Sequence, residues 1–194
     1  GMRGQKGSEY DGGHRVPFFL HWPGGGMDRK HLVKTLCHAV DMAPTLLELT
    51  GSSKPKGYKF DGRSIAGLLK PGAKVEWADR FLVTDSQRVR DPIKWRKSSV
   101  MSQRWRLVNG EELYDIEKDP GQEKNLAKEN PQQVEEMRAF YESWWAELEP
   151  TFAETTELHV GHKDHPVVSL TSHDWIQEAG TPWNQGHIRS KSPL

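Results

Sequence analysis

The sequence lacks an excess of charge of either sign, because its 194 residues include 27 lysines and arginines and 27 aspartates and glutamates. A nucleic-acid-binding domain normally carries a basic excess on one face, so we expect no nucleic-acid partner. No stretch approaches the roughly 20 apolar residues that a membrane-spanning helix needs, so we expect no membrane partner. These two absences exclude two large classes of function.

Cysteine is almost absent as well. The only one, Cys37, cannot form an intrachain disulfide, and it leaves the redox compartment undetermined. The first residues also lack the charged-then-apolar pattern of a secretory signal, so we expect the signal of an exported protein to lie outside this sequence. Hydrophobic residues make up only 35%, and the eight tryptophans partly compensate because each ring buries a large area.

Short apolar runs between glycine-rich turns characterise the first part of the chain. The run VPFFLHW at 16–22 ends in Pro-Gly-Gly-Gly, the pattern of a buried strand followed by a turn, and 31–40 favours a second strand. Residues 42–50 predict a helix, with Asp41 as its N-cap and Gly51 as its stop. Residues 62–70 predict another short helix.

From residue 80 the periodicity becomes that of short strands. Asn109-Gly110 separates the last two and is the strongest local signal for a tight hairpin turn. Asn130-Pro131 then begins a helix whose apolar residues recur at helical spacing up to Leu148, so we expect it to pack on the strands. The four predicted strands are RFLVTD, SSVMSQ, WRLVN and ELYDI.

The segment before the first apolar run combines Lys6 with several glycines in KGSEYDGG. Glycine allows a close approach of backbone to a ligand, and a lysine ammonium is a compact charge suited to an anionic oxygen. An ordinary glycine-rich loop with a solvated lysine fits the same residues. The residues alone leave both interpretations open.

Four blocks of the sequence resemble the sulfatase family, in the family's order. The first is similar to the family pattern GxxGGKGSxYEGGxRVPxxxxWPG and here reads GQKGSEYDGGHRVP before Trp22-Pro23-Gly24. The others are VDMAPTLLELTG at 40–51, FDGRSIAGLL at 60–69 and RWRLVNGEELYDIEKDPGQEKNLA at 104–127.

This resemblance implies a fold related to the alkaline phosphatases. That fold is α/β, with a large mixed sheet between helices and a smaller C-terminal antiparallel sheet. For this fragment we therefore expect an α+β arrangement: part of the large sheet, then the small sheet with a long helix packed on it. The expected boundaries are 1–75 for the end of the α/β domain, 76–150 for the antiparallel subdomain and 151–194 for an irregular tail.

The resemblance also implies hydrolysis of sulfate esters by a hydrated formylglycine, with Ca²⁺ polarising the sulfate. Lys6 matches the family's lysine that contacts the sulfate. His14 stands at a variable position that can reach substrate, and Arg15 matches a motif arginine with a structural or a substrate role. The nucleophile motif C/S-x-P/A-x-R is missing, because Asp41 stands where CHAVD would need arginine. We therefore interpret Cys37 as a small buried residue. The family's pair of aspartates and its later DNG-type metal motif are also missing, so we expect no metal ligands in this chain.

Two further groups of residues could bind ligands. Arg88, Lys94 and Arg96 surround Trp95, which suits a sulfated glycan, since arginine forks and aromatic faces bind sulfate and sugar rings. A solvated basic loop is the other interpretation. His159, His162 and His165 are three residues apart, but Gly161 and Pro166 disfavour the helix that a metal site would need, so we interpret them as loop histidines.

The resulting expectation is the C-terminal part of a calcium-dependent sulfuric ester hydrolase that acts on an aryl or carbohydrate sulfate and is inactive as this chain alone. A sulfated-glycan-binding module without catalysis and a phosphoryl-transfer relative of the same superfamily are the alternatives. An unpaired strand at 16–22 would favour a homo-oligomer through the exposed sheet edge. The family resemblance suggests a periplasmic or secreted protein.

Overall fold

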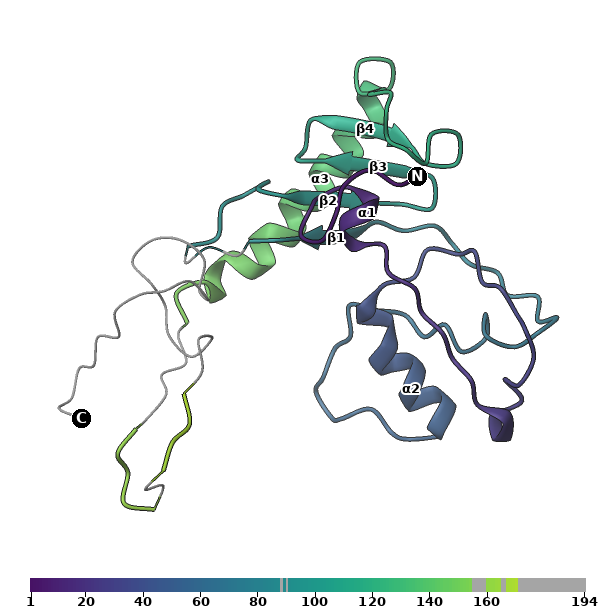
Figure 1. The fold of residues 1–194 in the computed structure, drawn as a ribbon, viewed down its shortest axis with the longest axis vertical. Coiled ribbons are helices and arrows are strands. Elements are labelled where there is room, and N and C mark those ends of the chain that lie inside the picture. Colours follow the sequence, from purple (N-terminus) through teal and green to yellow (C-terminus); the bar gives the residue numbers. More distant parts are fainter. Residues whose placement is uncertain (88, 90, 155–159, 165–166, 171–194) are drawn as a thin grey trace.

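The structure is a computed structural model that describes residues 1–87, 89, 91–154, 160–164 and 167–170. Its main elements are two helices and one four-stranded antiparallel sheet, an α+β arrangement (Figure 1). None of its helices within these ranges is both long and apolar enough to cross a membrane. The elements are α1 (Asp11–His14), α2 (Met42–Thr50), β1 (Leu82–Asp85), β2 (Ser98–Met101), β3 (Trp105–Val108), β4 (Glu112–Asp115), α3 (Pro131–Leu148) and the 3₁₀ turns Pro23–Gly25, Ala39–Asp41 and Glu149–Thr151.

The sheet is a meander in which each strand pairs with the next in the sequence, in the order β1-β2-β3-β4. The β3–β4 hairpin turns at Asn109 and Gly110, which have φ values of 51° and 72°. Two consecutive positive φ values define the turn whose twist matches that of paired strands, which explains the Asn-Gly pair. All four predicted strands and this turn are confirmed.

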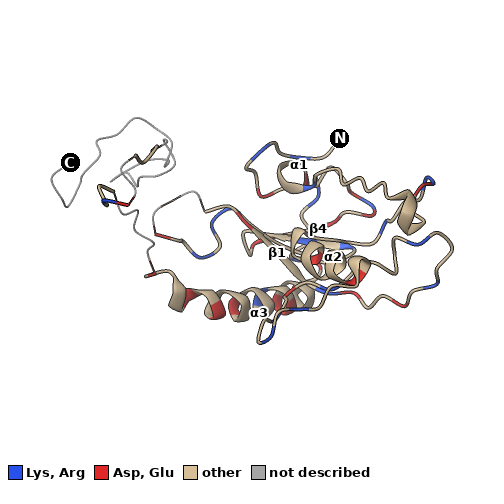
Figure 2. Ribbon diagram, turned by 90° about the horizontal axis from the view of Figure 1, so that it is seen from below, with Lys and Arg blue, Asp and Glu red and all other residues tan. Residues whose placement is uncertain are grey.

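The sheet carries different elements on its two faces (Figure 2). Successive residues of a strand point to opposite faces, and β3 shows this with Leu107 and Arg106. Leu107 belongs to the core cluster beneath α3, whereas Arg106 contacts Asp11 of α1. The long helix therefore covers one face, and the glycine-rich N-terminal segment covers the other.

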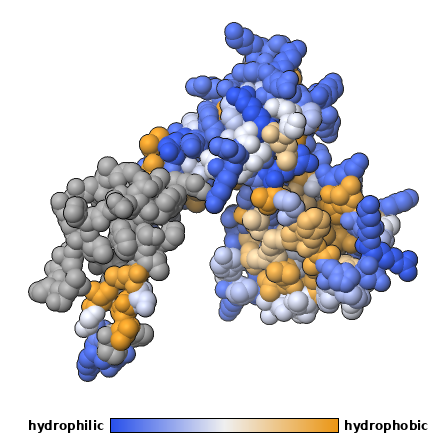
Figure 3. All heavy atoms as spheres, in the orientation of Figure 1, coloured by the Kyte–Doolittle hydropathy of each residue, from blue (hydrophilic) through white to orange (hydrophobic). Residues whose placement is uncertain are grey.

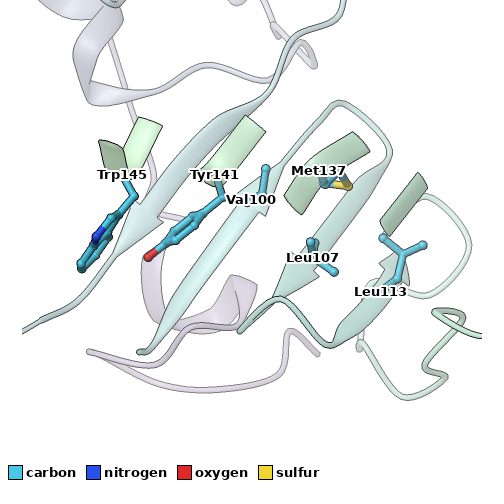
Figure 4. Close-up of a cluster of buried hydrophobic side chains, with 6 residues drawn as sticks. All are labelled: Val100, Leu107, Leu113, Met137, Tyr141 and Trp145. Atoms are coloured by element: carbon cyan, nitrogen blue, oxygen red, sulfur yellow. The ribbon is translucent and has the colours of Figure 1, made fainter. Parts of the chain in front are cut away.

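The hydrophobic core lies between α3 and the sheet, as predicted from the helical spacing. Met137, Tyr141 and Trp145 recur every four residues and are all buried. They form one cluster with a side chain from each of β2, β3 and β4, shown in Figure 4: Val100, Leu107 and Leu113. The helix begins at Pro131, as predicted, although the Asn130 side chain makes no capping hydrogen bond.

Two expected strands are absent from the part of the chain that the structure describes. Residues 16–21 make no backbone hydrogen bond to another described segment, and Phe19 is 92% exposed. The 31–40 segment is irregular up to the 3₁₀ turn at Ala39–Asp41. The prediction was wrong for a physical reason: an apolar run forms a buried strand only beside neighbouring strands, and here it has none. Figure 3 shows hydrophobic residues gathered around α2. Leu46 of this helix is exposed, and so is Tyr58 near it.

The predicted helix at 42–50 is confirmed as α2, and Gly51 ends it with a φ of 66°. The predicted helix at 62–70 is wrong, because residues 63–65 are irregular and only 66–69 form a turn. The expected capping by Asp41 is also wrong: its carboxylate accepts the His38 amide at 2.8 Å and so caps the preceding 3₁₀ turn. Asp41 also accepts the Arg63 amide at 2.9 Å and pairs with Arg80, so it connects three segments.

Candidate functional site

Lys6 lies in a tight turn at the start of the chain. The Ser8 amide donates to the Gln5 carbonyl at 2.8 Å, and Gly7 has a φ of 83°, a conformation that other residues rarely adopt. Lys6 is exposed and makes no ion pair with any residue that the structure describes. Its ammonium is therefore available to an anion from solution.

Two glycines of α1 touch the backbone of this turn. A Cβ atom on Gly13 would lie 2.1 Å from the Ser8 carbonyl oxygen, and one on Gly12 would lie 2.5 Å from the Arg3 and Gly4 carbonyl oxygens. The Gly12 amide also donates to the Arg3 carbonyl at 2.8 Å. The pair of glycines in the motif is thus required by close packing of the Lys6 turn on α1.

Helix α1 is held to the sheet by a buried ion pair. Arg106 of β3 donates through Nε to Asp11 Oδ1 at 2.9 Å, and the Asp11 and Arg106 side chains are only 2% and 5% exposed. The Asp11 amide donates to Gln122 Oε1 at 2.8 Å. Burial lowers the pKa of Arg106, and the Asp11 carboxylate opposes that shift. Removing either charge would leave the other buried without its partner, which is costly.

A second set of contacts fixes the N-terminal segment to β4. Tyr10 and Tyr114 both donate their hydroxyls to Glu112 Oε2 at 2.7 Å, and Arg3 donates to Tyr114 Oη at 3.0 Å. The Arg3 guanidinium lies 3.8 Å from the centre of the Tyr10 ring. Burial and the Glu112 hydrogen bond raise the pKa of Tyr114 to about 12, so its hydroxyl keeps its proton at neutral pH.

His14 and Arg15 both face Asp11. His14 Nε2 lies 4.0 Å from Asp11 Oδ1 with no hydrogen-bond partner, and its side chain is only 12% exposed. Arg15 Nη1 lies 3.6 Å from Asp11 Oδ2, but its side chain is 60% exposed. Lys6, His14 and Arg15 thus all lie in the N-terminal segment. Arg15 makes a structural contact with Asp11, and its guanidinium is still accessible.

Burial lowers the pKa of His14, although Asp11 opposes this shift. When the pH is below the ordinary pKa of histidine, His14 therefore binds a proton in the unfolded chain but not in the folded chain. The free energy of unfolding consequently falls as the pH falls through this range. We expect His14→Gln to reduce the loss of unfolding free energy between about pH 7.5 and about pH 5.5, measured by urea denaturation. His21→Gln, at an exposed position, is the control and should leave the loss unchanged. Equal losses in the original protein and in His14→Gln would contradict this assignment.

Lys94 and Arg96, in the connection between β1 and β2, make contacts away from the Lys6 segment. Lys94 pairs with Glu142 of α3 at 2.7 Å, on the face of the sheet opposite α1. Arg96 donates to the backbone carbonyls of Ser86 and Gln87 and so fixes its own loop. Arg88 lies outside the described residues. The described part of the predicted basic group therefore does not join the Lys6 segment.

Within the described ranges, no three histidine, cysteine, aspartate or glutamate side chains converge to hold a metal ion. The buried carboxylates Asp11, Asp41 and Asp115 each pair with an arginine instead. These residues do not fit a Ca²⁺ site. His162 pairs with Asp164 on the surface, while His159 and His165 lie outside the described residues.

Cys37 is half-buried rather than fully buried, and its thiol donates to the Thr35 carbonyl at 3.3 Å. Burial raises the pKa of this thiol, which disfavours the reactive thiolate. Cys37 therefore has the character of a packing residue.

A pocket of about 410 Å³ lies at the free edge of β1, between this strand and the end of α3. Its described lining contains Asp85, His38 and three aromatic side chains but no lysine or arginine. Burial lowers the pKa of His38 and so disfavours its positively charged form. Such a lining does not attract sulfate, so we place the candidate site at Lys6. The aromatic residues are Trp144, Trp145 and Phe152.

Several sulfatases resemble this chain. It is 30% identical over 146 residues to a sulfatase of Formosa agariphila, and 33% identical over 128 residues to the Delta 4,5-hexuronate-2-O-sulfatase of Bacteroides thetaiotaomicron. These matches cover 68% and 63% of this chain. Residues 5–143 match the family model described as N-sulphoglucosamine sulphohydrolase, C-terminal. The chain belongs to this family of sulfatase C-terminal regions.

The chain spans about a quarter of the length of these relatives, 26% in both cases. A solved structure of a 2-O GAG sulfatase is also similar, with 26% identity and a TM-score of 0.43. That match covers 60% of this chain and 26% of the solved one. The family model and the two sulfatase relatives confirm the sulfatase resemblance found in the sequence motifs.

Proposed function

We propose that this chain is the C-terminal part of a sulfuric ester hydrolase in which Lys6 contacts the sulfate group of the substrate. The observation that carries the proposal is an accessible lysine on a turn whose backbone is fixed from both sides, by α1 and by β4. A lysine whose backbone is held in place needs less reorganisation to bring its ammonium to the negative oxygens of a transition state. The nucleophile and the Ca²⁺ ligands then come from polypeptide outside this sequence.

The substrate class that we propose is a carbohydrate sulfate. An aryl sulfate is the alternative substrate. One relative is named for the 2-O-sulfate of a hexuronate, which supports a sugar ester. Arg15, with its exposed guanidinium beside the same turn, is the second group available to a sulfated sugar. We assign no substrate contact to His14, because its ring is buried beside Asp11.

We further propose that the apolar segment 16–22 becomes a strand of the large alkaline-phosphatase-like sheet in the longer polypeptide. The exposed side chains of this segment and the unpaired backbone of residues 16–21 favour a neighbouring strand. Without that neighbour, the same edge would pair with a second copy of this chain. Size-exclusion chromatography of the chain then reports a dimer or a larger assembly.

The test of the sulfate site uses a sulfated hexuronate disaccharide and the 194-residue chain. We expect Lys6→Ala to weaken binding about five- to tenfold in titration calorimetry, the effect of one charge-assisted hydrogen bond at an exposed site. Lys128→Ala, at an exposed position near α3, is the matched control and should leave the affinity unchanged.

Equal affinities for Lys6→Ala and the unaltered chain would contradict the role of Lys6. Hydrolysis of an aryl sulfate by the chain alone, in the presence of Ca²⁺, would contradict the assignment of the nucleophile to other polypeptide. The alternative function is a glycan-binding module without catalysis. It predicts that a longer polypeptide containing this chain also fails to release sulfate.

A further inference from the structure

We propose that Arg106 is a positioning residue: through its buried pair with Asp11 it holds the Lys6 turn in the place where Lys6 meets sulfate. This inference rests on the proposed function. It concerns a residue of β3 that is 95 positions from Asp11 in the sequence and outside the glycine-rich motif.

The first link is the ion pair itself. Arg106 Nε donates to Asp11, and Arg106 Nη1 donates to the carbonyls of Ser102 and Trp105. The guanidinium is therefore also fixed by hydrogen bonds to β3 and to the turn before it. Because the neighbouring Leu107 is fully buried under α3, this part of β3 has little freedom to move. The position of Asp11 is thus set by the core of the sheet.

The second link runs from Asp11 to the turn. Asp11 begins α1, and the next two residues, Gly12 and Gly13, touch the carbonyls of Arg3, Gly4 and Ser8 without room for a methyl group. A shift of α1 would therefore push or release the backbone on both sides of Lys6. Contacts this close transmit a displacement, since packed groups resist compression.

The nearby Arg104 offers a matched control. It pairs with Asp115 at 2.6 Å, but its side chain is 44% exposed and the pair does not touch the N-terminal segment. Arg104→Gln removes the same charge from the same region of the sheet. Effects seen in Arg106→Gln and absent in Arg104→Gln then belong to the Asp11 contact.

The first experiment measures amide hydrogen exchange in the 194-residue chain. In Arg106→Gln we expect the amides of Ser8, Gly12 and Gly13 to exchange roughly tenfold faster, while those of Leu107 and Leu113 keep their rates. Asp11→Asn serves as a second variant if Arg106→Gln does not fold, because it removes the other charge of the same ion pair and should accelerate the same turn amides. Unchanged turn amides, or equal acceleration throughout the sheet, would overturn the proposal.

The second experiment is a double-mutant cycle on binding of the sulfated hexuronate disaccharide. Lys6→Ala should weaken binding about five- to tenfold in the unaltered and Arg104→Gln backgrounds, but less than about twofold in Arg106→Gln. A purely structural role of Arg106 predicts the full Lys6 effect in every folded background and overturns the proposal. If Lys6→Ala has no effect in the unaltered chain, the sulfate role of Lys6 fails, and faster turn exchange in Arg106→Gln still identifies Arg106 as the anchor of that turn.

Discussion

Tyr141→Ala is expected to lower the free energy of unfolding by about 3–5 kcal/mol, the cost of removing a large buried aromatic ring. Tyr141 is fully buried at the centre of α3, and its ring stacks on Trp95 with 3.7 Å between the ring centres. Its hydroxyl donates to Asp85 Oδ2 at 2.9 Å and accepts the Trp95 amide at 3.0 Å. The substitution therefore opens a cavity and leaves two polar groups without partners.

Urea denaturation of three variants separates these effects. Tyr141→Phe keeps the ring and removes only the hydroxyl, so we expect a loss of about 1–2 kcal/mol. Ser143→Ala, at an exposed position of the same helix, should change stability by less than about 0.5 kcal/mol. A loss below about 1 kcal/mol for Tyr141→Ala would contradict the assignment of this residue to the core.

The β3–β4 hairpin and the helix α3 were predictable because residues close together in the sequence determine them. Asn109-Gly110 sets the hairpin, and the spacing of Met137, Tyr141 and Trp145 sets the apolar face of α3. Both signals depend on neighbours in the sequence. The strand expected at 16–22 failed because it depends on neighbours that the described chain does not provide.

The candidate site was predictable in part for the same reason. Lys6 and its glycines stand in one short motif, and the sequence pointed to them directly. The contacts of Arg106 and Gln122 with Asp11 were missed, since they join segments about 100 residues apart. The available signal was the alternation in β3, where a charged Arg106 stands between the hydrophobic residues Trp105 and Leu107 in a strand expected to be covered by a helix.

Lys6→Ala is expected to reduce sulfate release by the protein made from the complete reading frame about 100-fold. The ammonium of a fixed lysine stabilises charge that develops on the sulfate oxygens, and loss of one such group typically lowers the rate by about 10²–10³. The turn keeps its backbone contacts through Ser8, Gly12 and Gly13, so the variant should fold like the original protein. Lys128→Ala is the control with unchanged rate.

The most direct measurement is therefore the rate of sulfate release from a sulfated hexuronate disaccharide, with Ca²⁺, by the protein made from the complete reading frame and by its Lys6→Ala variant. We expect measurable release by the unaltered full-length protein and a rate about 100-fold lower for its Lys6→Ala variant. Equal rates for the two proteins would contradict the role of Lys6, and no release by the original protein would contradict the assignment of sulfatase activity.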